Sequence, residues 1–356
     1  MSRLRRVDCA TPGITRRRRG RGFEYVDQST GERISDEDVI QRIRALAIPP
    51  AWEDVWICAD PLGHIQATGQ DARGRKQYRY HDRWRERRDR EKFEDMLDFA
   101  NSLPKLRERV ERDLRKRKIS RDRVLACGIR LLDRGFFRIG SEDYAVENET
   151  YGLATMRKRH VKVSGNTLVF DYEAKGGKRR VQTIADPRVS RLVRQLRERR
   201  GGGHELLAYR NGEGWRDVRS TDINDYIQET VGVEHSAKDF RTWNATVLAA
   251  VVLAASARER DMTTKGGRNR AKRDAVKQVS EYLGNTPAVC RASYIDPRVF
   301  DRFDGGLTVG GVLDRLPEDP ADWPEIQRPI EEAVIDLIDR RESSPALEQV
   351  GQPGRN

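Results

Sequence analysis

The sequence has few of the residues that build metal centres and disulfide frameworks. Among its 356 residues are only four cysteines, at positions 9, 58, 127 and 290, and five histidines. Neither set shows the spacing of a metal-ligand cluster. We therefore expect free thiols, a reducing compartment and no resident metal.

Several familiar site motifs are also missing from the sequence. It has no G-x-x-x-x-G-K-[ST] phosphate loop, no G-x-G-x-x-G after a predicted strand, no H-E-x-x-H and no G-x-S-x-G. These absences argue against nucleotide-driven, dinucleotide-dependent and zinc-protease chemistry, and we expect no cofactor. Chemistry on nucleic acid would then depend on a covalent mechanism that uses tyrosine, arginine and lysine.

Long hydrophobic stretches are absent as well. The longest nearly apolar run, Ala245–Ala257, is too short to span a bilayer and predicts a buried helix. Residues 1–22 contain eight arginines and no apolar centre, unlike a signal peptide. The sequence therefore predicts a cytoplasmic protein that is not associated with membranes.

Positive charge is abundant and unevenly distributed. Lys and Arg number 69 against 57 Asp and Glu, a formal net charge of +12. Residues 307–356 carry 5 basic and 11 acidic residues, a net of −6, so the rest of the chain carries +18. This balance favours nucleic acid as the partner, although a merely soluble basic protein is the alternative. The acidic end could be an interaction tail or a mask over the basic surface.

The order of β-favouring and helix-favouring segments predicts an α+β fold with a small β-rich domain and a larger, mainly helical catalytic domain. Four short β-favouring pieces lie between residues 23 and 82, with one helix near residues 36–47. Helical spacing of apolar residues dominates afterwards. The expected division is a disordered basic arm (1–22), a β-rich DNA-clamping domain (23–82), a mainly helical catalytic domain (83–305) and an acidic carboxy-terminal extension (306–356).

A three-stranded antiparallel sheet is predicted inside the helical domain. Its strands are expected at 160–163, 167–172 and 179–184, joined by the turns SGN and AKGGK. The second turn places Lys175 at a hairpin tip. We also expect the KGGRN segment, residues 265–269, to be flexible.

Four segments, in chain order, resemble the motifs of one enzyme family. They are QATGQDARGRKQYRYH (66–81), FFRIGSEDYAVENETYGLATMRKRHV (136–161), KDFRTW (238–243) and LGNTPAVCRASY (283–294). Together they resemble the type IB DNA topoisomerases, in particular the bacterial and poxvirus branch. The resemblance covers roughly residues 23–305, so the basic arm and the acidic extension lie outside it.

The resemblance implies a reaction on duplex DNA that needs neither ATP nor a metal ion. Tyr294 would attack a backbone phosphorus, displace the 5′ oxygen and form a 3′-phosphotyrosyl intermediate. The free end swivels, supercoils relax, and the 5′ hydroxyl attacks back. A phenol has an ordinary pKa near ~10, so the nucleophile needs activation, which a neighbouring cationic cluster favours.

The same resemblance assigns the groups around the nucleophile. Arg138 and Arg241 would donate to the non-bridging oxygens, because guanidinium groups stay charged and donate in a fixed plane. Asn285 stands where poxvirus and eukaryotic members carry histidine. It is expected to donate a hydrogen bond without shuttling a proton. Lys175 would be the general acid for the leaving oxygen, with Lys178 as the alternative.

Further positions are implied to contact DNA. Aromatic side chains among cations suit a surface that touches sugar edges and phosphates. The expected contacts are Gln77, Tyr78 and Tyr80 in the clamping domain, Tyr144 and Lys238 near the cleaved strand, and Arg291, which is also a candidate phosphate ligand. We expect a monomer whose two lobes close around the duplex.

Two other functions remain open from the sequence. Tyrosine recombinases share the Arg, Lys, Arg, Tyr chemistry, but usually have histidine three residues before the second arginine, where this chain has Lys238. A DNA-binding protein with a decayed site is the other alternative. It conflicts with the presence of the family's residue type at every expected catalytic position except Asn285. For each arginine a structural ion pair remains the alternative role, as does an inward-facing position for Tyr78 and Tyr80.

Overall fold

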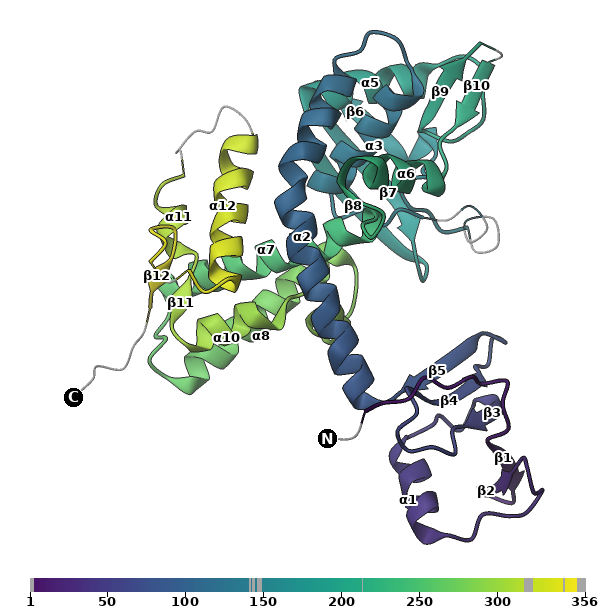
Figure 1. Ribbon diagram of the computed structural model, residues 1–356. Helices are drawn as coiled ribbons and strands as arrows, with labels where there is room; N and C mark the ends of the chain where they lie inside the picture. The colour runs from purple at the N-terminus through teal and green to yellow at the C-terminus, as the bar shows by residue number, and fades with distance from the viewer. Residues whose placement is uncertain are drawn as a thin grey trace. The chain divides into compact units, whose positions relative to one another are not determined.

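The chain folds into two compact units, residues Met1–Lys92 and Phe93–Asn356. The structure, a computed structural model, describes residues 3–140, 142, 145, 149–212, 214–316, 323–341 and 343–350 (Figure 1). The division falls inside helix α2 (Asp82–Leu114). One unit is rich in strands and the other is mainly helical, so the predicted α+β class is confirmed.

The first unit is built on a five-stranded antiparallel sheet in the order β2-β1-β3-β4-β5. A small core of Ile14, Ile43, Val55, Ile57 and Ala67 holds the sheet against helix α1. The elements are β1 (Ile14–Arg19), β2 (Gly22–Asp27), α1 (Glu37–Ala45), β3 (Glu53–Ile57), β4 (Ile65–Gln70) and β5 (Lys76–Tyr80).

The basic arm predicted to be disordered is instead partly a strand of this sheet. Strand β1 contains the run of arginines and pairs with β2 on one side and β3 on the other. Ile14 is buried, and the guanidinium of Arg16 donates to the carbonyls of Pro49 (3.1 Å) and Trp52 (2.6 Å). Backbone pairing does not depend on side-chain charge, so exposed strand positions accept arginine. For this reason the charge run misled the prediction.

The second unit surrounds one continuous hydrophobic core. A hairpin, β9 and β10, lies where only helices were predicted. Besides α2, the elements are α3 (Arg121–Arg134), a 3₁₀ turn (Lys158–His160), β6 (Val161–Ser164), β7 (Thr167–Ala174), β8 (Lys178–Ala185), α5 (Pro187–Glu198), β9 (Ala208–Asn211), β10 (Gly214–Asp217), α6 (Ser220–Val231), α7 (Ala237–Glu259), α8 (Lys265–Leu283), α9 (Pro287–Ser293), α10 (Pro297–Asp304), β11 (Leu307–Thr308), α11 (Gly310–Leu313), α12 (Trp323–Ile338) and β12 (Glu348–Gln349).

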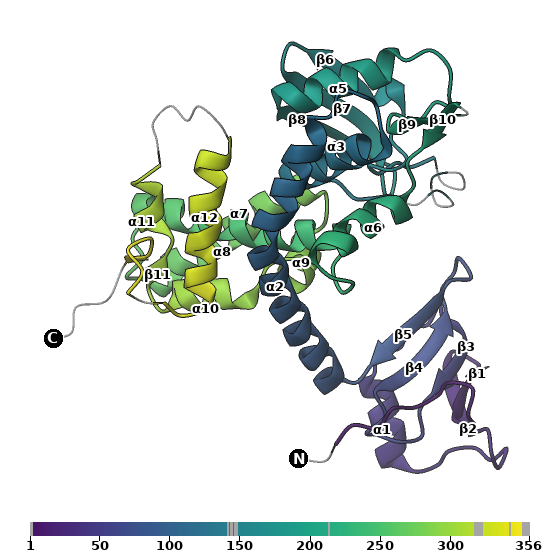
Figure 2. The same ribbon diagram turned by 45° about the horizontal axis from the view of Figure 1, so that its top comes forward.

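The predicted three-stranded sheet is present, in the order β6-β7-β8. Helix α5 packs on β6 and β7 (Figure 2). Leu168, Phe170 and Tyr172 of β7 are buried, in keeping with the two-residue period of a strand. In the register Tyr172 lies opposite Arg180, and Ala174 lies opposite Lys178. Lys175 is therefore the first residue of the hairpin turn.

Helix α7 runs through the core of the second unit. In the described part of the chain, it alone is long and apolar enough to cross a membrane. Two-thirds of its most apolar window (67%) is buried, however, and Trp243, Ala245 and Ala249 are completely enclosed. Its apolar sequence is explained by packing inside the unit.

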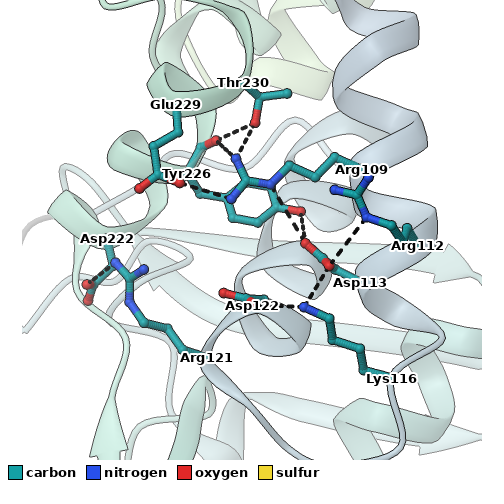
Figure 3. Close-up of polar contacts among 10 residues, drawn as sticks. All are labelled: Arg109, Arg112, Asp113, Lys116, Arg121, Asp122, Asp222, Tyr226, Glu229 and Thr230. Atoms are coloured by element: carbon teal, nitrogen blue, oxygen red, sulfur yellow. Dashed lines mark hydrogen bonds and ion pairs between the residues drawn. The ribbon is translucent and has the colours of Figure 1, made fainter.

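A polar network joins the helices α2, α3 and α6 (Figure 3). The buried carboxylate of Asp113 accepts from the hydroxyl of Tyr226 at 2.8 Å and pairs with Lys116 at 2.8 Å. Arg109 donates to Thr230 at 2.5 Å and pairs with Glu229 at 2.9 Å. Because each buried polar group in this network has partners, it can fix the helices without an unpaired buried charge.

The second unit corrects the expectation that the KGGRN segment is flexible, and it shows where the acidic extension packs. The KGGRN segment forms the first turn of α8, where Thr264 caps the helix by accepting from the N–H of Gly267 at 3.0 Å. The acidic extension contributes α12 to the core, burying Ala333, Val334 and Leu337. The glycines of KGGRN led to the expectation of flexibility, whereas the cap from Thr264 orders this segment. The amphipathic helix that the sequence pattern indicates near residues 329–340 is observed as part of α12.

Candidate active site

Tyr294 lies at the carboxy-terminal end of α9, with its backbone held from two directions. Its N–H donates to the carbonyl of Cys290 at 3.0 Å, and its carbonyl accepts from the hydroxyl of Thr246 in α7 at 3.3 Å. The same hydroxyl accepts from the N–H of Asp296 at 3.1 Å. The phenol is half-buried. Its backbone position is therefore set by the end of α9 and by the hydrogen bond from Thr246 of α7.

Arg241 extends from α7 to the phenol. Its guanidinium carbon lies 5.4 Å from the centre of the Tyr294 ring, and the side chain is buried. Nη1 donates to the carbonyl of Phe136, and Nη2 donates to the carbonyl of Leu283 at 3.0 Å. Burial and then the charge of Arg138 lower the pKa of Arg241 to about 10, so the group remains a cation at neutral pH.

Arg138 belongs to the segment after α3, which runs alongside the segment around Gly152. The N–H of Leu153 donates to the carbonyl of Arg138 at 2.8 Å. Gly140 and Gly152 touch so closely that a Cβ on Gly152 would lie 2.4 Å from the Cα of Gly140. These contacts fix the backbone that carries Arg138. The preceding Phe136 adopts a left-handed conformation with φ of 40°, which turns its carbonyl to Arg241.

Asn285 completes the cluster. It follows Gly284, which ends α8 in the left-handed conformation (φ 65°), and its N–H donates to the carbonyl of Ser280 at 3.1 Å. The side-chain oxygen accepts from Arg138. The amide nitrogen Nδ2 is buried and has no hydrogen-bond partner among the described atoms. An unsatisfied buried donor beside two guanidinium groups suits an anionic oxygen supplied by a ligand.

The structure adds Arg180, which the sequence analysis did not identify. Its guanidinium donates to the carbonyl of Glu281 at 2.7 Å and to the carbonyl of Tyr282, and it lies near enough to Arg138 for their charges to interact. Strand alternation is the signal that could have identified it. Tyr172 is inward-facing, so its partner in the register, Arg180, must share that face.

The two candidate lysines occupy the β7–β8 hairpin. Lys175 and Lys178 are both exposed. Gly176 and Gly177 have φ values of 82° and 69°, the left-handed conformation that allows a tight turn after Lys175. Lys178 closes the hairpin opposite Ala174. Lys175 thus has the tip position that was expected, and its role as general acid stays a prediction.

The other predicted contacts of the second unit lie on its surface. Lys238 is exposed one turn before Arg241 on α7. Arg291 is exposed three residues before Tyr294, with its guanidinium 4.9 Å from the ring centre of Phe300. It lines a basic hollow formed with residues of α8, namely Gly266, Asn269, Arg270, Lys272 and Arg273. Tyr144 lies outside the described residues.

In the first unit the predicted contacts separate onto two faces of strand β5. Tyr78 and Tyr80 are exposed, at 43% and 39%, and their rings stack 5.9 Å apart. Gln77 lies on the other face, where its amide donates to Asp71 at 2.9 Å. The alternative of inward-facing tyrosines is therefore wrong for this edge strand. The expected grouping of Gln77 with the two tyrosines is not observed.

Across the described ranges, no group of three or more acidic, histidine or cysteine side chains lies close enough together to hold a metal ion. The four cysteines are free thiols. The cluster of Arg138, Arg241 and Asn285 next to the phenol presents donors only, an arrangement that suits a phosphate.

Comparison with known proteins gives consistent matches. Residues 81–303 match the family described as eukaryotic DNA topoisomerase I, catalytic core, and residues 22–71 match bacterial DNA topoisomerase IB, N-terminal domain. A DNA topoisomerase 1B from Acanthamoeba polyphaga mimivirus is 33% identical over 288 residues, covering 80% of this chain and 85% of that protein. A DNA topoisomerase 1B from vaccinia virus (strain Copenhagen) is 23% identical over 161 residues, covering 43% and 51%. DNA topoisomerase 1 beta of Arabidopsis thaliana is 24% identical over 179 residues, covering 50% and 18%.

Proposed function

The chain belongs to the type IB DNA topoisomerases, and we propose that it relaxes supercoiled DNA through a transient bond between Tyr294 and a DNA 3′ phosphate. The observation that carries this proposal is the convergence of Arg138, Arg241 and the unpaired amide nitrogen of Asn285 beside the Tyr294 phenol. Three donors and one nucleophile match the needs of in-line attack on a phosphodiester.

In the cleavage step the phenol oxygen of Tyr294 bonds to phosphorus, and the bond from phosphorus to the 5′ oxygen breaks. The phenol proton passes to solvent. The guanidinium groups of Arg138 and Arg241 and the Nδ2 of Asn285 stabilise the negative charge that grows on the non-bridging oxygens. Because Arg241 is held by two backbone carbonyls, little reorganisation is needed when this charge develops.

The leaving 5′ oxygen needs a proton, which we assign to Lys175 at the tip of the β7–β8 hairpin, with Lys178 as the alternative. After the free end has rotated, the 5′ hydroxyl attacks the phosphotyrosyl phosphorus. Its proton returns to the lysine, and the phenol oxygen leaves. The covalent bond preserves the energy of the phosphodiester, so the cycle needs neither ATP nor a metal ion.

Double-stranded DNA is the substrate, since the family acts on DNA. We further propose that the chain works as a monomer in the cytoplasm, associated with the nucleoid and not with membranes. Exposed Tyr78 and Tyr80, Lys238 and the basic hollow that includes Arg291 are the surfaces that we assign to DNA. Their cations give affinity that does not depend on base sequence.

The decisive experiment is relaxation of supercoiled plasmid in EDTA without ATP. We expect the wild-type chain to relax the plasmid and to form a protein–DNA adduct that survives denaturation. Tyr294→Phe should lose both activities and retain DNA binding, because only the nucleophilic oxygen is removed. Relaxation by that variant would exclude Tyr294 as nucleophile, and site-specific joining of two DNAs would favour a recombinase.

A further inference from the structure

Arg180 joins two parts of the second unit that carry different catalytic groups. It lies on β8, shortly after the turn that carries Lys175, and donates to the carbonyls of Glu281 (2.7 Å) and Tyr282 in the last turn of α8. The chain continues from that turn through Gly284 to Asn285. A single side chain thus connects the hairpin of the general acid with the segment of a phosphate donor.

The environment of Arg180 is unusual for a structural arginine. No carboxylate in the described part of the chain forms an ion pair with it, whereas the neighbouring Arg179 pairs with Asp171 at 2.6 Å. It is instead partly buried beside the charge of Arg138, and burial lowers its pKa. Repulsion from a second guanidinium is tolerated because helix carbonyls at the end of α8 attract a cation.

The contact with α8 is closely packed. A Cβ built on Gly284 would lie 3.0 Å from Nη1 and 3.2 Å from Cδ of Arg180. The hairpin turn, in contrast, lies in open space, because a Cβ built on Gly176 or Gly177 would meet no atom within 4 Å. Arg180 connects the strand that leaves this turn with closely packed atoms at the active site.

We propose that Arg180 is a positioning residue that fixes the β7–β8 hairpin to the end of α8, so that Lys175 is held at the leaving oxygen. The proposal rests on the proposed function, and it assigns Arg180 to proton delivery and not to phosphate binding. Loss of Arg180 should therefore impair the departure of the 5′ oxygen more than the binding of DNA.

The test compares single-turnover cleavage of two duplexes that differ in one atom. One has the ordinary 5′ oxygen at the cleaved bond, and the other has sulfur there, which leaves as a thiolate without needing a proton. We expect Arg180→Ala to cleave the oxygen substrate ~10²-fold more slowly, at the lower end of the usual contribution of a general acid. Cleavage of the sulfur substrate should change by less than about threefold, because no proton transfer is needed.

Two further variants distinguish a loss of hairpin positioning from a general loss of folding. Arg180→Lys keeps a cation that can reach the carbonyls of α8 but loses the planar fork, and should recover part of the cleavage rate of the oxygen substrate. Arg179→Ala, on the exposed face of the strand, should cleave both substrates like the wild type. Melting temperatures of all variants establish that each is folded before rates are compared.

Equal slowing of both substrates by Arg180→Ala would overturn the proposal, as would unchanged cleavage of the oxygen substrate. These outcomes leave the proposed function intact, provided that the wild-type chain forms the Tyr294 adduct. Absence of that adduct in the wild type would instead overturn the proposed function and this inference together.

Discussion

At the residue scale, Arg241 is held by backbone carbonyls, and no carboxylate in the described ranges forms an ion pair with it. Its two bonds, to Phe136 and Leu283, need the fork of a guanidinium. We expect Arg241→Lys to slow cleavage by ~10²–10³-fold, because a single ammonium cannot hold both carbonyls and also donate to phosphate. Single-turnover cleavage of a labelled duplex measures the effect, and a rate within a few-fold of wild type would contradict it.

The buried amide of Asn285 allows a sharper substitution. Asn285→Asp keeps the oxygen that accepts from Arg138. It replaces the Nδ2 donor by a second oxygen and adds a negative charge where the phosphate would bind. We expect cleavage to fall by at least ~10²-fold. Equilibrium binding to duplex, measured in parallel on the Tyr294→Phe background, separates loss of catalysis from loss of affinity. Unimpaired cleavage would show that this donor faces no substrate oxygen.

His160 predicts a pH dependence of stability that is independent of activity. It is buried next to Tyr151, and burial, with the charges of Arg159 and Arg157, lowers its pKa to about 4. An unfolded histidine has a pKa of about 6.5, so between these values only the unfolded chain binds the proton. The free energy of unfolding should therefore be highest above pH 6.5 and fall as pH drops towards 4.

The size of this loss is at most about 3.4 kcal/mol, from 1.36 kcal/mol per pKa unit. Urea unfolding at pH 7, 5.5 and 4.5 measures it, and His160→Gln should flatten the difference between these pH values. Parallel curves for wild type and variant would assign the acid sensitivity to other groups.

The residues that a motif fixed lie together in the structure, whereas a run of charge alone did not indicate which of its residues faces the site. Arg138, Arg241, Asn285 and Tyr294, chosen by resemblance, are brought together in space. Arg180 lies in a run of three basic residues, and nothing in their charge distinguishes it. Only the pairing of β7 with β8 turns it inward.

At the element scale, α12 is attached to the core by a buried ion pair. Glu331 accepts from Arg107 of α2 at 2.6 and 2.8 Å, and Arg107 also bonds Asp133 of α3. We expect Glu331→Gln to lower the free energy of unfolding by about 1.5–3 kcal/mol, the usual worth of a hydrogen bond to a charged group. Chemical denaturation provides the measurement.

The adjacent helix position offers a matched control. Glu332 pairs with Arg328 on the exposed side of α12, where solvent screens the charges. Glu332→Gln should change stability by no more than about 1 kcal/mol. Equal losses of unfolding free energy in the two variants would contradict the idea that the Arg107–Glu331 pair stabilises the attachment of α12.

Elements with a clear hydrophobic period were predictable from the sequence, and those defined by tertiary contacts were not. The sheet of β6, β7 and β8 followed from alternation and turn residues, and α1 lies within the range where one helix was expected, near residues 36–47. Strand β1 could not be recognised, because its arginines resemble a tail until β2 and β3 pair with it. The first turn of α8 is glycine-rich but is ordered by the cap from Thr264.

At the scale of the whole molecule, the net charge of +12 predicts steep salt dependence of DNA binding. Each neutralised phosphate releases counterions, so affinity for a short duplex should fall by ~10³-fold or more between ~50 and ~200 mM salt, as for about six phosphate contacts. Fluorescence anisotropy with the Tyr294→Phe variant measures binding without cleavage. A nearly flat response would contradict the assignment of the basic surfaces to DNA.

The distance in sequence between Arg107 and Glu331, 224 residues, has a consequence for synthesis of the protein. A nascent chain that has already exposed Tyr294 and all its companion arginines still lacks the helix that braces α2 and α3. Translation that stops before residue 323 should thus give a product that is removed by proteolysis and does not nick the chromosome. The second unit can therefore reach its full stability only after α12 has been synthesised.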